Sequence, residues 1–211
     1  SEPVMEQNYL LRALWQHKKL SSALRNEGCD ILFVPGGSFT TDFRPVVTMS
    51  QNLLPFELRE TFHYGVSLLT LKFLTLRLSQ TLSFKKSCGT IFLTKYAKDA
   101  VLKVTGTLTG ATAIIPHGVG GIFFLPPRRQ REISEYSNEN PFQILYVSTI
   151  EPYKHHLAVI EALAKLRNEG YPLILKLIGS GNPIELLRLN NKIKNVDPQE
   201  KFIEYLGFVP Y

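Results

Sequence analysis

The stretch Phe142-Gln-Ile-Leu-Tyr-Val-Ser-Thr-Ile-Glu-Pro-Tyr-Lys-His-His-Leu-Ala-Val-Ile-Glu-Ala-Leu163 decides the fold of this chain. Residues 142–147 are rich in β-branched and aromatic side chains, whereas Leu157, Ile160 and Ala164 follow helical spacing. The spacing of the apolar residues changes from that of a strand to that of a helix in the polar loop 148–154. A buried strand, a short loop and an amphipathic helix begin a Rossmann-like unit, so we predict an α/β fold with parallel sheets.

The loop 148–154 is predicted to lie at the carboxyl end of its strand, where open α/β sheets bind ligands. Free backbone N–H groups in the first turn of the following helix attract phosphate. Lys154, expected at that turn, adds a full positive charge. Two interpretations follow from the residues, a phosphate-binding lysine or a solvated lysine that caps a surface loop.

The residues Ser148-Thr149-Ile150-Glu151-Pro152-Tyr153-Lys154 resemble the start of the C-terminal domain of group 1 (family 4) retaining glycosyltransferases of the GT-B type. In that family a strand is followed by Gly-Arg or Gly-Thr, then Pro and Lys. The resemblance implies that Lys154, with Ser148 and Thr149, binds the diphosphate of the sugar donor. Where many members have Gly-Arg, this chain has Ser148-Thr149, which removes one diphosphate-binding charge.

Composition narrows the class of protein. A chain of 211 residues with 44% hydrophobic residues is long enough for one large domain or two smaller ones. The formal charge of +6 favours anionic partners. No RNP-like aromatic pair, zinc-finger spacing or Arg-rich tract is present, so no nucleic-acid partner is expected. Cys29 and Cys88 lack CxxC or metal spacing and predict free thiols in a reducing compartment, hence a cytoplasmic protein.

The first half of the chain is predicted to alternate helices and strands. The expected elements are a helix over 4–26 that Gly28 ends, strands over 30–34 and 45–49, a helical tract over 58–86, a strand over 89–94, a helix over 95–104 capped by Thr94, and a strand over 113–116. Gly36 and Gly37 follow the first strand. They either let a ligand approach the backbone or serve a tight turn.

The loop 50–57 resembles a glycosyltransferase acceptor loop. Many members have a His-Asp pair there, and here Ser50-Gln51-Asn52 stands in its place. The resemblance implies that Asn52 provides a hydrogen bond but cannot take a proton. Glu57 is the nearest carboxylate, with the alternative that it lies in the first turn of a helix, where a negative charge suits the dipole. Gly36, Gly37, Asn52 and Glu57 are thus the acceptor-side candidates, and no catalytic residue is assigned.

The tract 58–86 contains many apolar residues with basic residues between them. Lys72 and Arg77 interrupt any run of about 20 apolar residues, so it is not expected to span a bilayer. It either lies on an anionic membrane surface, as a peripheral contact at the inner membrane face, or packs its apolar side on the sheet.

A second segment carries the resemblance. In the family, a strand, a Ser or Thr cap, a helix and a strand ending in Pro-x-Gly-Val close the first domain. Here they read Ile91-Phe-Leu-Thr94 and Ile115-Pro-His-Gly-Val119. The resemblance places His117 and Gly118 in the donor cleft, and a hinge histidine held by backbone partners is the alternative for His117.

The second half begins after the polar, proline-flanked stretch 126–141, which is predicted to be a linker. Beyond the opening strand and helix, we expect a strand over 173–178, a helix over about 183–195 and a strand over 202–206. Gly179 and Gly181 correspond to a Gly-x-Gly of the family. Phe208 and Val209 match the family's segment that faces the donor base.

These observations predict a GT-B-like α/β fold, two Rossmann-like domains with parallel sheets, over 1–125 and 142–211. We expect both domains to be incomplete, with the family's Glu-x7-Glu segment lying past Tyr211. The resemblance implies a retaining hexosyltransferase of polysaccharide biosynthesis, which moves a sugar from a nucleotide diphosphate donor to a glycan or lipid-linked acceptor. It also implies that the enzyme needs no metal or cofactor. Two alternatives stay open, a nucleotide-sugar epimerase and a non-enzymatic basic module that binds a membrane or a partner.

Overall fold

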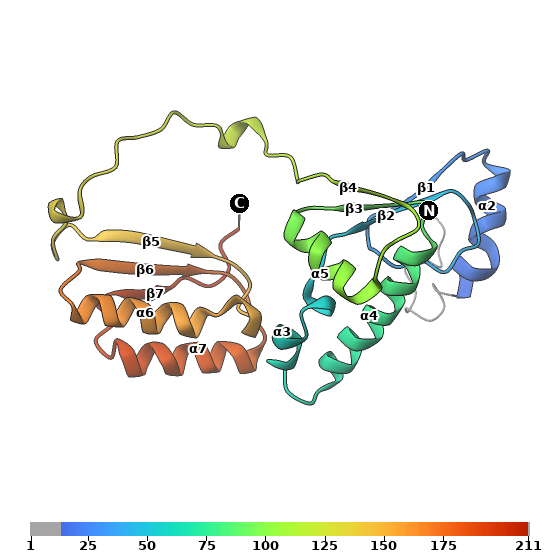
Figure 1. The fold of residues 1–211 in the computed structure, drawn as a ribbon. Helices are drawn as coiled ribbons and strands as arrows, with labels where there is room; N and C mark the ends of the chain where they lie inside the picture. Colours follow the sequence, from blue (N-terminus) through green and yellow to red (C-terminus); the bar gives the residue numbers. More distant parts are fainter. Residues whose placement is uncertain (1–13, 211) are drawn as a thin grey trace. The chain divides into compact units, whose positions relative to one another are not determined.

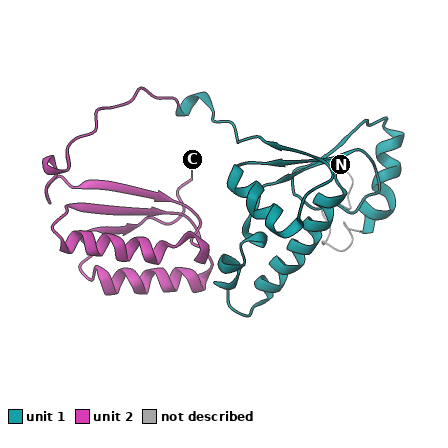
Figure 2. Ribbon diagram, viewed as in Figure 1, with its two compact units in different colours: residues 1–123 teal, residues 124–211 magenta. Residues whose placement is uncertain are grey.

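The computed structural model describes residues 14–210, which fall into two compact units. Unit 1 covers residues 1–123 and unit 2 covers residues 124–211 (Figures 1 and 2). Each unit contains one parallel sheet with helices packed on it, and each is described by itself. No helix among residues 14–210 is long and apolar enough to cross a membrane.

Unit 1 is built on a four-stranded parallel sheet. Its strands are β1 (Leu32–Val34), β2 (Val46–Ser50), β3 (Gly89–Phe92) and β4 (Ala111–Ile114), in the order β1-β2-β3-β4. Val47 pairs with Gly89, and Gly89 with Ala111. The strand predicted over 113–116 therefore begins earlier, because the chain pairs with β3 from Ala111 onward, directly after Gly110, where an added Cβ would lie 2.4 Å from the Ser87 carbonyl oxygen.

Helices cover one face of this sheet. The helices α4 (Leu68–Lys86) and α5 (Lys95–Thr105) lie on the same side of the strands (Figure 1). Their core with the sheet is formed by Phe56, Phe84, Phe92, Val101 and Leu108. The predicted Thr94 cap is confirmed, since the Thr94 hydroxyl accepts a hydrogen bond from the Ala97 N–H at 3.0 Å.

The expectation of one helical tract over 58–86 is wrong. A short helix α3 (Leu58–Phe62) is separated from α4 by a turn in which Gly65 has φ +63°. Ser67 then caps α4 by accepting a hydrogen bond from the Thr70 N–H at 3.2 Å. A glycine that ends one helix and a serine that begins the next outweigh the continuous apolar pattern.

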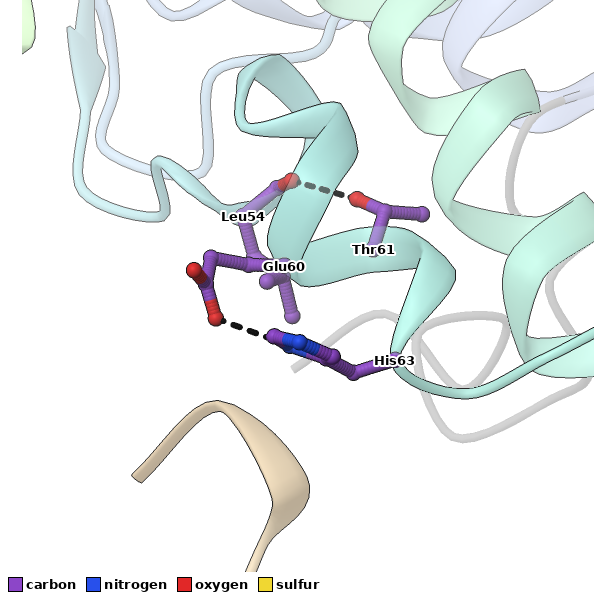
Figure 3. A network of polar contacts seen from close by, with 4 residues as sticks. All are labelled: Leu54, Glu60, Thr61 and His63. Atoms are coloured by element: carbon purple, nitrogen blue, oxygen red, sulfur yellow. Dashed lines mark hydrogen bonds and ion pairs between the residues drawn. The ribbon is translucent and has the colours of Figure 1, made fainter. Parts of the chain in front are cut away.

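A side-chain hydrogen bond joins α3 to the preceding 3-10 helix η3 (Leu54–Phe56), and a second polar contact lies between α3 and its C-cap residue. The Thr61 hydroxyl donates to the Leu54 carbonyl at 2.7 Å, and His63 Nδ1 lies 3.1 Å from Glu60 Oε2 (Figure 3). The loop predicted over 50–57 thus contains a helical turn that leads directly into α3.

The first predicted helix, 4–26, lies partly outside the described residues. Its described part contains a π-helical segment, η2 (Gln16–Leu20), followed by α2 (Ser21–Asn26). Gly28 follows with φ +67°, as expected of a helix stop. The π-helical turn carries no signal that we recognised in the sequence.

Unit 2 has a three-stranded parallel sheet in the order β5-β6-β7. The strands are β5 (Phe142–Val147), β6 (Leu173–Ile178) and β7 (Ile203–Tyr205), and the helices α6 (His156–Asn168) and α7 (Pro183–Val196) lie on one face (Figure 1). Leu173, Leu175 and Leu177 of β6 are buried against these helices. The alternating burial of β6 is what a sheet with helices on one face requires.

The stretch 126–141, predicted to be a linker, is mostly exposed. It contains one turn of 3-10 helix, η5 (Ile133–Glu135), which Glu132 and Glu135 stabilise as a capping box.

Candidate functional site at the carboxyl edge of the second sheet

Two loops lie side by side where β5 and β6 end. The Ser148 N–H donates to the Ile178 carbonyl at 2.9 Å, and the Ile150 N–H donates to the Ser180 carbonyl at 2.8 Å. Ile150 and Gly181 form an isolated parallel bridge. The loop after β5 and the turn after β6 therefore continue the sheet as a joined pair of backbone segments.

The two glycines of this turn are required by close backbone approach. Gly179 has φ +152°, and a Cβ there would lie 1.8 Å from the Ser148 carbonyl oxygen. A Cβ on Gly181 would lie 2.8 Å from the Ile150 Cβ. The contact between the loops thus explains the Gly-x-Gly spacing by itself.

The segment after β7 joins the same edge. The Tyr205 hydroxyl donates to the Gly179 carbonyl at 2.7 Å, and the Gly179 N–H donates to the Gly207 carbonyl at 2.8 Å. Phe208 and Val209 follow, 71% and 50% exposed. Among the sequence-predicted residues, the structure therefore brings Ser148, Thr149, Gly179, Gly181, Phe208 and Val209 to one edge of unit 2.

Lys154 lies just before α6 rather than in its first turn, which corrects the expected placement. It ends a 3-10 turn, η6 (Pro152–Lys154), and α6 begins at His156 after His155, which has φ +56°. The left-handed residue between the two helices separates them. The Lys154 carbonyl accepts from the Tyr146 hydroxyl at 2.7 Å, and its ammonium lies 4.8 Å from the Tyr153 ring centroid. The backbone at Lys154 is thus anchored to β5, while its half-buried side chain places the charge near the Tyr153 ring.

His156 is a residue of this edge that the sequence analysis missed. Its side chain is buried, with 3% exposed, and stacks on Tyr146 with ring centroids 4.6 Å apart. Neither ring nitrogen has a hydrogen-bond partner among residues 14–210. Burial, and secondarily the Lys154 charge, lower the pKa of His156 below its usual value. The spacing of His156, Ile160 and Leu163 places all three on the buried side of α6, and this spacing could have identified it.

Gly36 and Gly37, which the sequence predicts for the acceptor side, lie in unit 1 in the turn after β1. Gly37 has φ +81°, and a Cβ there would lie 2.9 Å from Gln80 Nε2. The Gln80 amide donates to the Gly36 carbonyl at 3.4 Å. The turn and its packing on α4 therefore account for Gly37 without a ligand.

Asn52 and Glu57 both have local partners. Asn52 Oδ1 accepts from the Leu54 N–H at 3.0 Å, at the start of η3. Glu57 occupies the N-cap position of α3, and its carboxylate accepts from the Tyr96 hydroxyl at 2.6 Å. That hydrogen bond raises the pKa of Tyr96. His117 and Gly118 lie in the exposed stretch after β4.

Within the described part of the chain, no group of three or more His, Cys, Asp or Glu residues is arranged to hold a metal ion. Cys29 and Cys88 are both free and exposed.

Comparison with known proteins identifies structures that share the fold of this chain. No protein-family signature and no curated protein matches the chain. Among solved structures, HepE of Anabaena in complex with UDP is similar over 90% of this chain and 51% of its own, with 16% identity and a TM-score of 0.57. Sucrose-phosphate synthase of Thermosynechococcus elongatus is similar over 90% of this chain and 48% of its own, with 16% identity and a TM-score of 0.61.

A third similar structure is TarM of S. aureus in complex with fondaparinux, alpha-GlcNAc-glycerol and UDP, with 14% identity and a TM-score of 0.56 over 85% of this chain and 33% of its own. The chain spans about half the length of HepE and of the synthase. The likeness confirms the predicted fold class, a GT-B-like α/β fold with two Rossmann-like units and parallel sheets.

Proposed function

We propose that this chain is part of a glycosyltransferase that moves a sugar from a nucleotide diphosphate donor to an acceptor. The observation that carries the proposal is the carboxyl edge of β5-β6-β7, where two joined loops, a helix N-terminus and Lys154 converge. HepE, which shares the fold, has been crystallised with UDP and with UDP-glucose.

The proposed donor site uses this edge for the diphosphate. The first N–H groups of a helix have no intrahelical partners, and they favour an anion at the start of α6. Lys154 precedes that start by two residues, and its charge contributes to lowering the pKa of His156 in the first turn. Its ammonium would neutralise charge on the departing diphosphate, which is where such a transferase needs electrostatic stabilisation. Thr149 would contribute its backbone N–H, Ser148 and Thr149 would contribute their hydroxyls, and Phe208 and Val209 would contact the base.

The remaining sequence-predicted residues stay proposals for the same function. We assign Gly179 and Gly181 to the donor edge of unit 2, and His117 and Gly118 to the donor cleft on unit 1. Gly36, Gly37, Asn52 and Glu57 are proposed for the acceptor side. For the last two, a role in acceptor binding requires that their local hydrogen bonds be shared with the ligand.

The resemblance in the sequence supports a more specific proposal for the family, the stereochemistry and the acceptor. We infer a retaining enzyme of group 1 (family 4), acting as a hexosyltransferase on a glycan or lipid-linked acceptor in polysaccharide biosynthesis. A nucleotide-sugar epimerase is the alternative on the same fold. Product analysis separates the two, because a transferase needs an acceptor and releases a free nucleotide diphosphate, whereas an epimerase isomerises the donor without one.

The donor site is tested by mapping nucleotide contacts on the isotope-labelled chain by NMR. We expect UDP to shift the amide signals of Ser148, Thr149 and the first turn of α6, and UMP, which lacks the second phosphate, to shift them much less. Equal effects of UDP and UMP, or shifts confined to other parts of unit 2, would contradict a diphosphate site at this edge.

A further inference from the structure

The polarity of α4 is reversed relative to an ordinary surface helix. Its buried residues are the three polar side chains Thr70, Gln80 and Ser83, together with the core residue Phe84. Its exposed residues include four leucines, here called the leucine face of α4: Leu68, Leu71, Leu78 and Leu82, which are 85%, 58%, 66% and 58% exposed. A helix that only covers a sheet turns its apolar side inward. The burial of this helix therefore does not explain its leucines.

The leucine face forms one continuous stripe. At 3.6 residues per turn, the four leucines fall within an arc of about 80°, which also contains Thr75 and Lys86, and Lys72 and Lys85 widen it to about 140°. The stripe runs from the first turn of α4 to its last and is about 21 Å long, at 1.5 Å per residue from Leu68 to Leu82. An apolar hollow of about 440 Å³ lies along its first half, lined by Leu68, Leu71 and Leu76 with Lys72, Thr75 and Ser79.

The charges along this stripe have a single sign. Lys72 borders the leucines on one side, Lys85 borders them on the other, and Lys86 lies at the C-terminal end; all three are exposed. The sequence contains no Asp or Glu from Thr61 to Lys98. A face intended only for contact with water normally carries both signs of charge, so this arrangement favours a partner with negative charge around an apolar interior.

We propose that the leucine face of α4, with Lys72, Lys85 and Lys86, binds in the plane of an anionic lipid surface. Leucines at the centre and lysines at the borders match the layering of a bilayer interface, where apolar side chains enter the acyl boundary and lysines meet the headgroups. The helix lies along the surface, in agreement with the finding that no described helix can span a membrane. This inference does not depend on the donor site of unit 2, because all of its residues belong to unit 1.

Vesicle sedimentation tests the proposal with the 211-residue chain. We expect the protein to sediment with vesicles of phosphatidylcholine and phosphatidylglycerol, and much less with phosphatidylcholine alone, at about 0.1 M salt. The double variant Lys85→Glu/Lys86→Glu should lower the partition coefficient at least tenfold, because each basic residue near the surface contributes to binding. Leu71→Ser/Leu78→Ser should lower it by a similar or larger factor, because two inserted leucines are lost.

The matched control variants change exposed lysines and exposed aliphatic residues that lie outside α4. Lys18→Glu/Lys19→Glu changes the same charge in the segment before α2, and Ile184→Ser/Leu187→Ser removes residues of α7 that are 64% and 62% exposed. These controls should leave the partition coefficient within about threefold of the parent, since they lie outside the stripe. Circular dichroism confirms that all variants fold alike.

Three results would overturn the proposal. They are no sedimentation of the parent protein with anionic vesicles, equal sedimentation of the α4 variants and the parent, and equal losses in the control variants. Absence of lipid binding together with a tight protein complex through α4 would assign the leucine face to a protein partner. None of these results bears on nucleotide binding by unit 2, so the two proposals fail separately.

Discussion

His156 places a titratable ring in a buried site without hydrogen-bond partners among the described residues. Burial lowers its pKa below the usual value of 6.5, so the native protein holds a neutral ring where the unfolded chain would bind a proton. Below about pH 6.5 the unfolded state therefore takes up more protons than the native state, and unfolding becomes more favourable. The stability associated with neutral His156 is fully present above that pH and is lost as the pH falls toward the native pKa.

We predict that His156→Phe makes the free energy of unfolding less dependent on pH between about 7.5 and 5. Phenylalanine keeps the stacking on Tyr146 and removes the titrating group. Urea unfolding at several pH values measures the effect. His155→Phe, at the neighbouring position, is the control. An unchanged pH dependence in His156→Phe would show that the ring is not held neutral by its site.

The surroundings of Gly179 allow a specific prediction about the stability of the protein. A Cβ at this position would lie 1.8 Å from the Ser148 carbonyl oxygen, so Gly179→Ala must push the two loops apart. We expect a loss of roughly 3 kcal/mol in the stability of the protein from overpacking and backbone strain. The measurement is urea unfolding followed by circular dichroism.

Gly170→Ala is the control for Gly179→Ala. Gly170 has φ +94° but no atom within 4 Å of its added Cβ, so it tests backbone strain without the clash. The control should lose clearly less stability than Gly179→Ala. Equal losses would mean that the contact between the loops is not what requires a glycine at 179.

The site was predictable at the level of loops and much less so at the level of side chains. The change of period after Val147 and the Gly179-Ser-Gly181 turn identify an edge of the sheet, and the structure joins these two segments. The sequence does not show that His155 would adopt φ +56° and leave Lys154 in a separate 3-10 turn. That detail depends on the anchoring of Lys154 by Tyr146, which is a tertiary contact.

At the scale of elements, the entry into β7 depends on Asp197. This residue is 2% exposed, and its carboxylate accepts from the N–H groups of Lys201, Phe202 and Ile203 at 2.9, 2.7 and 2.8 Å. Asp197→Ala leaves these donors without their acceptor, and a buried donor without a partner costs about 1–3 kcal/mol. We therefore predict a loss of roughly 3 kcal/mol or more on urea unfolding.

Asp197→Asn is the graded control for the entry into β7. The amide retains one carbonyl oxygen, so this variant should lose less stability than Asp197→Ala. If both substitutions leave the unfolding midpoint unchanged, Asp197 does not organise this loop.

Local sequence signals are sufficient to predict helix ends in this chain, but not to predict which side of α4 is buried. Thr94, Ser67 and Gly65 mark helix ends by their chemistry, although the continuous apolar pattern over 58–86 obscured the last two. The reversed polarity of α4 could not be read in the same way. Both sides of that helix carry leucines or other apolar residues, and only the structure shows that Thr70, Gln80, Ser83 and Phe84 are the buried ones.

At the scale of the whole molecule, we predict that the 211-residue chain transfers no sugar by itself. It spans only 51% of HepE and 48% of sucrose-phosphate synthase, which share its fold. Transfer requires that donor and acceptor be aligned as well as bound. Incubation with UDP-glucose and other nucleotide sugars, with product analysis by mass spectrometry, tests this. Turnover above the uncatalysed rate would show that this chain contains the complete site.

The central claim is that the carboxyl edge of β5-β6-β7 binds a nucleotide diphosphate, with Lys154 as its cation. The most direct measurement is calorimetric titration of the chain with UDP and GDP, comparing the parent, Lys154→Ala and the control Lys165→Ala, an exposed lysine farther along α6. We predict binding by the parent that Lys154→Ala weakens by about 1.5–3 kcal/mol, roughly tenfold to a hundredfold, while Lys165→Ala leaves it unchanged. No binding of either nucleotide, or equal affinities for the parent and Lys154→Ala, would contradict the claim.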